Sequence, residues 1–287
     1  MRRSPETQMK GNGSPVEHPA GPQKMLRYAR GLENRLDYTP PAAAIQPVLN
    51  ITSALEKVFR YEVHNFDCLL KTGPAIVVAN HGILPVEMFM LGARYFQKTG
   101  RIFRGITDPR TFQTPLLRDL WTTLGVVDGT PDNAVALLLR GEKIMIMPGG
   151  AREAFKSTRQ RYKIRWEGRA GVARIAIRAK VPVIPVTCVG VDHMYYVAND
   201  AYRFEKLFRE RLGTKLIPIS FFFGIGPFPF PAKLTQTVGE PIYFDEPAST
   251  LDDPARLESL QSRVAQTMQS MLDNALATYD PFAGSVV

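Results

Sequence analysis

Short apolar runs and amphipathic segments alternate through the middle of the chain. The apolar runs have the length of buried strands, and they occupy 75–79, 101–107, 126–128, 143–148 and 181–190. The segments between them have helical spacing, and they occupy 85–98, 115–125, 130–142 and 168–180. Strands that alternate with helices are typical of a sheet covered by helices on both faces. The pattern therefore predicts an α/β fold.

Local signals set the ends of these helices. Thr130 stands at an N-cap position with Pro131 at the first helical position, and Gly141 lies just past the predicted end. Gly100 ends the helix predicted over 85–98 in the same way. These helix-end residues stand where the periodic pattern begins or ends, so the two kinds of signal predict the same helices.

The last third of the chain predicts a late strand and turn at 235–244 and a helix over about 253–277. Asp253 is the expected N-cap, with Pro254 next. One face of this helix carries a stripe of apolar residues: Leu257, Leu260, Val264, Met268, Met271 and Leu272. We expect the stripe to pack on the domain rather than on a partner.

The N-terminal region has a different composition. Residues 1–24 are rich in Pro, Gly and polar residues, which predicts a disordered tail. Residues 25–62 are basic and compatible with a helix that is interrupted at 39–47, where the sequence reads TPPAAAIQP. The expected organisation is this tail followed by a single domain over 25–287.

Composition and charge narrow the class of protein. Hydrophobic residues make up 45% of the chain, which suits a globular core, and the formal net charge of +9 suits an anionic partner such as nucleic acid, a membrane surface or a phosphorylated molecule. The two cysteines form no metal-ligand spacing, so we expect reduced thiols, no metal and a cytoplasmic location. Neither a signal peptide nor a spanning helix is predicted, and a peripheral position on the inner face of a membrane is expected.

The first candidate for chemistry is the histidine that ends the strand at 75–79. A lone histidine there is most often structural. Gly82 leaves room for a ligand, and Pro85 would start a helix with Glu87 in its first turn. Glu87 is then either a helix cap or the partner that orients the His81 imidazole and raises its basicity.

The second candidate is the Pro-Gly-Gly sequence after the strand at 143–148. Backbone amides at Gly149 and Gly150 would suit an oxyanion or a phosphate, with the Arg152 cation beside them, although a simple turn explains the glycines as well. The sequence contains neither a Walker loop nor a G-x-S-x-G motif.

A basic segment follows at 156–169. A solvated loop is one interpretation, and a site for donor or headgroup phosphates is the other. The candidate phosphate ligands are Lys156, Arg159, Arg161, Lys163 and Arg165. Nucleic acid would also suit the charge, but no recognised binding motif accompanies it, so we expect no nucleic-acid partner.

The aromatic, proline-rich sequence FFFGIGPFPFP lies at 221–231. It is either a buried strand with a turn or a loop that dips into a membrane or lines an acyl chain. His193, Tyr195 and Tyr196 are further candidates to line an acceptor site.

Four sequence blocks in order resemble the glycerolipid acyltransferase (PlsC-like) superfamily. They read NHGILPVE at 80–87, LGVVDG at 124–129, MPGGAREA at 147–154 and VPVIPV at 181–186. The resemblance covers about 60–245 and implies a mixed, mostly parallel sheet flanked by helices, with a helical N-terminal segment and a C-terminal helix. It also implies an O-acyltransferase that uses acyl-CoA or acyl carrier protein as co-substrate, with no bound cofactor.

The resemblance implies a role for each matching residue. His81 would act as general base on an acceptor hydroxyl, and Glu87 would hold it in place. Amides around Gly149 and Gly150 would stabilise the oxyanion, and Arg152 would support substrate binding.

Departures from the common blocks bear on the acceptor. Five residues separate His81 from its acid where four are common, the acid is Glu rather than Asp, and Gly149 and Ala151 replace the Glu and Thr of the common third block. Gly129 stands where an arginine usually meets the acceptor phosphate. The blocks are most similar to diacylglycerol acyltransferase type 2 and the phytyl ester synthases, which favours a neutral lipid acceptor.

Two alternatives remain open from the sequence. One is a lysophosphatidate-type 1-acylglycerol-3-phosphate acyltransferase, and the other is a non-catalytic lipid- or CoA-binding protein of the same fold.

Overall fold

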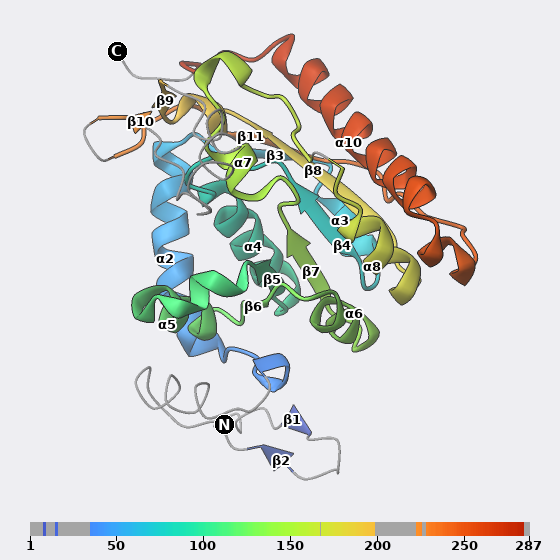
Figure 1. Cartoon of the computed structure of the whole chain (residues 1–287). Helices are drawn as coiled ribbons and strands as arrows, with labels where there is room; N and C mark the ends of the chain where they lie inside the picture. Colours follow the sequence, from blue (N-terminus) through green and yellow to red (C-terminus); the bar gives the residue numbers. More distant parts are fainter. Residues whose placement is uncertain are drawn as a thin grey trace, which may run out of the picture.

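A seven-stranded sheet forms the centre of the computed structural model, with strand order β3-β11-β8-β4-β7-β5-β6 (Figure 1). The structure describes residues 35–166, 168–198, 222–225 and 228–283, together with the short pair β1 (Gln8–Met9) and β2 (Pro15–Val16). The strands of the sheet are β3 (Glu62–His64), β4 (Ile76–Ala79), β5 (Phe103–Thr107), β6 (Val127–Asp128), β7 (Lys143–Ile146), β8 (Val183–Val189) and β11 (Thr235–Val238).

Five adjacent strands of this sheet, from β8 to β6, are parallel. Strand β11 pairs antiparallel with β8 and parallel with the edge strand β3, so β11 and β3 run in the opposite direction to the other five. The prediction of a mixed, mostly parallel sheet is therefore confirmed. Every strand that the apolar runs predicted is present, whereas β3 lacks such a run and was not predicted.

Helices cover both faces of the sheet (Figure 1). The α-helices are α2 (Ala42–Val58), α3 (Asp67–Lys71), α4 (Val86–Thr99), α5 (Pro115–Thr123), α6 (Pro131–Leu139), α7 (Gly150–Ala154), α8 (Gly171–Ala179) and α10 (Pro254–Leu276). Short 3-10 turns are η1 (Arg35–Asp37), η2 (Pro109–Gln113), η3 (Thr158–Gln160), η4 (Val191–His193) and η5 (Ala248–Asp252). A two-stranded ribbon of β9 (Tyr196–Val197) and β10 (Phe222–Phe223) stands apart from the sheet.

Alternate side chains of β4 explain the two helical layers. Ile76 and Val78 belong to a core that includes residues of α6, α8 and α10. Val77 and Ala79 belong to a second core, with residues of α3 and α4. Because successive strand residues point to opposite faces, a strand buried on both faces reads as a continuous apolar run.

The predicted helix ends are present. The Thr130 hydroxyl accepts the Asn133 N–H at 3.2 Å, and the Asp253 carboxylate accepts the Arg256 N–H at 3.0 Å. Gly100 ends α4 in the left-handed region, with φ of 68°. In α10 the residues at 257, 260, 264, 268 and 272 are buried, and the helix packs on β8 and α8, which confirms that the stripe faces the domain.

One prediction in the N-terminal segment was wrong. Helix α2 begins at Ala42, directly after Pro41, and continues through Pro47 without the expected interruption. Pro47 is the sixth residue of the helix, beyond the first turn in which proline is tolerated, so packing of α2 on α4, with Ala44 and Ile45 buried, must offset its cost. The predicted disordered tail at 1–24 lies, apart from β1 and β2, outside the described residues. Among the described helices, none is both long and apolar enough to cross a membrane.

Candidate active site

The candidate residues gather where three neighbouring parallel strands end. Strand β4 lies between β7 and β8, so the segments that follow these strands meet at one edge of the sheet. Asn80 joins two of these ends, because its side chain accepts the Cys188 N–H at 2.8 Å and donates to the Cys188 carbonyl at 3.1 Å. Ligand sites of open α/β sheets form at such carboxyl edges.

His81 follows β4 and is half-buried. Its Nδ1 lies 2.7 Å from the carbonyl oxygen of Gly82. A carbonyl oxygen can only accept, so Nδ1 carries the proton and Nε2 is left as the basic nitrogen. Burial lowers the pKa of His81 to about 4, so the imidazole is neutral at pH 7.

Glu87 lies in the first turn of α4 and is fully buried. Neither carboxylate oxygen has a hydrogen-bond partner among the described residues, so neither the predicted bond to His81 nor the predicted cap bond is present. The Gly82 carbonyl takes the orienting role that the sequence suggested for Glu87. Burial raises the pKa of Glu87 to about 8, which leaves the carboxyl mostly protonated at pH 7.

The Pro-Gly-Gly loop follows β7 and leads into α7. The Gly150 N–H donates to the Met147 carbonyl at 3.0 Å, so it is used within the turn and is not the free amide that the sequence suggested. Arg152 is half-buried in α7. Arg169, which sequence reasoning did not single out, donates from Nη1 to the Pro148 carbonyl and lies beside Gly150.

Glu153 is a buried acid that sequence reasoning missed. Its side chain is fully inaccessible to solvent, and Oε1 accepts the backbone N–H of His81 at 2.9 Å. Oε2 lies 3.4 Å from the backbone nitrogen of Arg165, which donates to it. The available signal was an acid in the short segment after a buried strand, in the same block as Gly149 and Gly150.

The basic segment divides into buried and exposed parts. Lys156 is buried, and its Nζ lies 2.9 Å from Oδ1 of Asp192, 3.3 Å from the Glu153 carbonyl and 3.4 Å from the His81 carbonyl. The solvated-loop interpretation is therefore wrong for Lys156. Arg159 and Lys163 are exposed and fit that interpretation.

The other two arginines of the segment are half-buried and bind within the protein. Arg161 donates from Nε to the Asp192 carbonyl at 2.9 Å, and Arg165 donates from Nη1 to Gln160 at 2.9 Å. A phosphate role for the segment stays a prediction, and it suits Arg159 and Lys163 best because their side chains face solvent.

Asp192 and His193 connect the segment after β8 to Tyr162. The Tyr162 N–H donates to Oδ2 of Asp192 at 2.6 Å. The Tyr162 hydroxyl accepts the Gly190 N–H at 2.8 Å and shares a hydrogen bond of 2.7 Å with Nδ1 of His193. His193 is thus held by Tyr162.

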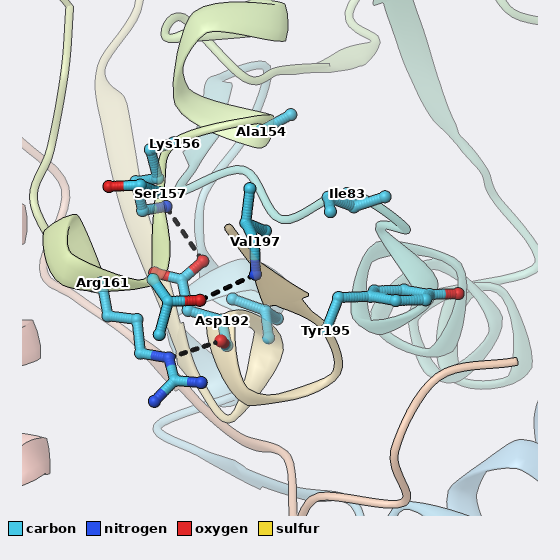
Figure 2. A pocket seen from close by; sticks show the side chains of 10 residues that line it. Ile83, Ala154, Lys156, Ser157, Arg161, Asp192, Tyr195 and Val197 are labelled. Atoms are coloured by element: carbon cyan, nitrogen blue, oxygen red, sulfur yellow. Dashed lines mark hydrogen bonds and ion pairs between the residues drawn. The ribbon is translucent and has the colours of Figure 1, made fainter. Parts of the chain in front are cut away.

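A small pocket lies beside the His81 loop (Figure 2). Its lining combines apolar and polar side chains: Ile83, Ala154, Lys156, Ser157, Thr158, Arg161, Val191, Asp192, Tyr195 and Val197. Figure 2 shows the Lys156–Asp192 pair on one side of the pocket and Ile83 and Tyr195 on the other. Of the further acceptor candidates, Tyr195 lines this pocket, and Tyr196 is 52% exposed.

The aromatic segment at 221–231 adjoins the pocket in its described part. The Phe222 ring packs edge-on against Tyr195, with centroids 5.4 Å apart. The interpretation as a buried strand is wrong for the large apolar side chains described here, which are all exposed: Phe222, Phe223, Ile225, Phe228 and Phe230. We call these five residues the aromatic patch.

Comparison with protein families gives one match that covers most of the chain. The model of the diacylglycerol acyltransferase family matches residues 65–276. This range contains His81, Glu87, the Pro-Gly-Gly loop, the basic segment and the pocket.

Curated relatives include a protein of Bos taurus named "DGAT1/2-independent enzyme synthesizing storage lipids". It is 29% identical over 213 residues, which are 74% of this chain and 59% of the relative. The Homo sapiens protein of the same name is also 29% identical, and the match covers 61% of its length. An uncharacterized protein of Mycobacterium tuberculosis is 30% identical over 244 residues, 82% of this chain and 66% of that protein. The chain thus spans about three fifths of the first two relatives.

The structural comparison supports the fold. The crystal structure of the 1-acyl-sn-glycerophosphate acyltransferase PlsC from Thermotoga maritima aligns with a TM-score of 0.53 over 89% of this chain and 88% of that chain. The sequences are 17% identical, so this likeness concerns the fold alone.

Proposed function

The chain belongs to the diacylglycerol acyltransferase family, and we propose that it transfers a fatty acyl group from a thioester to the hydroxyl of a neutral lipid. The proposed donor is acyl-CoA or acyl carrier protein. The proposed acceptor is a neutral glycerolipid or alcohol, and His81 is the proposed general base.

The state of His81 is the observation that carries this proposal. Its Nδ1 proton is bound to the Gly82 carbonyl at 2.7 Å, and burial lowers its pKa to about 4. At pH 7 the imidazole therefore presents an unprotonated Nε2 without first losing a proton to solvent. A general base needs this protonation state.

The proposed reaction is a direct transfer. Nε2 of His81 takes the proton of the acceptor hydroxyl as its oxygen attacks the thioester carbonyl carbon. The C–S bond then breaks, and the imidazolium returns the proton to the thiolate that leaves. The new ester and the free thiol account for all atoms, and no covalent acyl-enzyme is required.

Glu87 is proposed to balance the charge that His81 gains during transfer. Its buried carboxyl has no hydrogen-bond partner among the described residues, so an interaction with the imidazolium would not compete with an existing bond. A neighbouring cation would favour the ionised form of Glu87, which burial alone disfavours.

The Pro-Gly-Gly loop is proposed to face the oxyanion of the tetrahedral intermediate. The Gly149 amide is the proposed donor, because the Gly150 N–H is already bound to Met147. Arg152 and Arg169 bring positive charge to the same segment, and Arg152 is proposed to support substrate binding.

The pocket beside Ile83 is small, so it is proposed to hold the hydroxyl end of the acceptor and not the whole lipid. Of the two cations in its lining, Lys156 is paired with the Asp192 carboxylate at 2.9 Å and Arg161 donates from Nε to the Asp192 carbonyl at 2.9 Å. Gly129 supplies no further charge for an acceptor phosphate. The pocket is also adjacent to the aromatic patch, where an acyl chain would avoid water. These features favour a neutral glycerolipid over a lysophosphatidate.

A donor and acceptor panel tests the proposal. Purified protein is incubated with a labelled acyl chain on CoA or on acyl carrier protein, together with diacylglycerol, monoacylglycerol, a long-chain alcohol or lysophosphatidate. Label in a neutral ester is the expected product. Label chiefly in phosphatidate would support the lysophosphatidate alternative. Binding of lipid without any transfer would support the non-catalytic alternative.

A further inference from the structure

We infer that Glu153 is a positioning residue for His81, and that the missing side chain of Gly149 provides the space for its carboxylate. The inference deepens the proposed function, because it rests on His81 as the base. Glu153 acts through the backbone of His81 and not on the substrate.

The contact between Glu153 and His81 joins two elements far apart in sequence. Oε1 of Glu153 accepts the His81 N–H at 2.9 Å, across 72 positions of the chain. His81 lies just beyond the end of β4, where the strand pairing of Val78 and Ala79 stops. The carboxylate thus takes over the N–H that the sheet no longer binds, and it fixes the direction in which the chain leaves the strand.

Gly149 explains how a carboxylate reaches this place. A Cβ built on Gly149 would lie 1.9 Å from Oε2 and 2.4 Å from Cβ of Glu153, so no other residue fits here while Glu153 keeps its position. The backbone itself does not require glycine, since φ is −64° and ψ is −28°. Gly149 is therefore needed for space and not for conformation.

Lys156 holds the same peptide segment from the other side. Its Nζ lies 3.4 Å from the His81 carbonyl and 3.3 Å from the Glu153 carbonyl, while Asp192 pairs with it at 2.9 Å. Both polar groups of the His81 backbone are thus bound by the segment that follows β7. A base displaced by about 1 Å can lose roughly 100-fold in rate, so this support would matter for catalysis.

The first experiment compares Glu153→Ala and Glu153→Gln with the wild-type chain. Glu153→Gln keeps an oxygen for the His81 N–H and gives up only the acceptor of the longer bond from the Arg165 N–H, so we expect kcat within about fivefold of wild type. Glu153→Ala leaves that N–H buried and unbound, so we expect kcat to fall about 100-fold with the donor and acceptor KM unchanged. Glu258→Ala, which changes an exposed glutamate of α10, is the matched control.

The second experiment moves the carboxylate to position 149. Gly149→Asp alone places a side chain against Glu153, and Glu153→Gly alone removes the carboxylate, so both are expected to lose activity. The double variant Gly149→Asp/Glu153→Gly restores a carboxylate in the vacated space, and we expect it to recover at least tenfold over Glu153→Gly. Gly73→Asp is the control, since nothing lies within 4 Å of a Cβ there.

A titration that does not depend on turnover separates this inference from the proposed function. The His81 pKa is followed by NMR, with the resonance assigned by its loss in His81→Gln. In Glu153→Ala we expect the released His81 segment to become more exposed and its pKa to rise by at least one unit from about 4. Near-UV circular dichroism and thermal unfolding establish that each variant is folded.

The outcomes are distinct. If the wild type transfers no acyl group but the His81 pKa rises in Glu153→Ala, the proposed function fails and the positioning role stands. A folded Glu153→Ala variant with unchanged kcat and unchanged His81 pKa would overturn the inference. A double variant no more active than Glu153→Gly would overturn the explanation of Gly149.

Discussion

Nδ1 of His81 donates a 2.7 Å hydrogen bond to the carbonyl oxygen of its neighbour Gly82. This contact sets the tautomer of the imidazole within the loop itself, and it leaves Nε2 as the basic nitrogen. The proposed base therefore does not depend on Glu87 for its orientation in the free protein. The role proposed for Glu87 is instead to balance the positive charge that His81 gains during transfer. Experiments can therefore distinguish the effects of the two residues.

The pH dependence of activity should reflect the low pKa of His81. Burial lowers this pKa to about 4, and the base must be unprotonated to act, so activity is lost only as pH falls through about 4. We expect kcat/KM to stay level between pH 5 and pH 7. The measurement is a pH–rate profile with a neutral acceptor. A decline centred near 6.5 would show an ordinary, solvated histidine instead.

Glu87→Gln should reduce the loss of folding stability that the wild-type chain shows at alkaline pH. Because the pKa of Glu87 is about 8 in the folded chain against 4.5 ordinarily, the folded state binds the extra proton between these values. The contribution of Glu87 to the free energy of unfolding is fully present below pH 4.5 and is lost as pH rises through 8. The total loss is on the order of a few kcal/mol. Urea unfolding at pH 6 and pH 9 should show a smaller loss in the variant. An equal loss in both proteins would contradict the assignment.

Lys156 and Asp192 should be strongly coupled in stability. Both side chains are buried, and the pair distance is 2.9 Å. Lys156→Met leaves a buried carboxylate without its cation and should cost about 3–5 kcal/mol. Adding Asp192→Asn removes that charge but keeps an acceptor for the Tyr162 N–H, so the double variant should recover part of the loss. Urea unfolding of the full mutant cycle measures this, and additive single effects would speak against the coupling.

The aromatic patch should bind lipid surfaces. Phe223 is 56% exposed and Phe228 70% exposed, beside the pocket proposed for the acceptor. Burying each ring in a bilayer would contribute about 1.5–3 kcal/mol, so Phe223→Ser/Phe228→Ser should weaken liposome binding at least tenfold in a flotation assay. The control Leu116→Ser/Leu139→Ser changes exposed residues of α5 and α6, away from the patch (Figure 1). Equal loss in both variants would exclude a specific role for the patch.

The sequence predicted the sheet because its central strands are buried on both faces. Continuous apolar runs such as 75–79 and 181–190 admit few other interpretations, and the caps at Thr130 and Asp253 depend on local chemistry alone. Helix α2 was predicted less well, because Pro47 argues against a helix locally while packing on α4 favours one. Tertiary contacts, and not local propensity, stabilise α2 as a continuous helix.

The candidate site was predicted in its location but not in its contacts. His81 and the Pro-Gly-Gly loop could be assigned to one edge of the sheet, because they follow strands that proved to be neighbours. The sequence could not show that Glu153 folds back onto Gly149, since a space left by one residue and filled by another is visible only in three dimensions. For the same reason the sequence left Lys156 as either part of a solvated loop or a phosphate ligand. Its buried partner Asp192 is 36 positions away, so the ion pair could not be predicted.

Acyl transfer by His81→Gln tests the central claim most directly. Release of free thiol from acyl-CoA, dependent on diacylglycerol, is followed for the wild-type chain and for the variant under saturating substrate. General-base catalysis contributes about 10²–10⁴-fold, so we predict a loss of that size in a variant whose unfolding temperature is unchanged. Undiminished release by folded His81→Gln would contradict the assignment of His81 as the base.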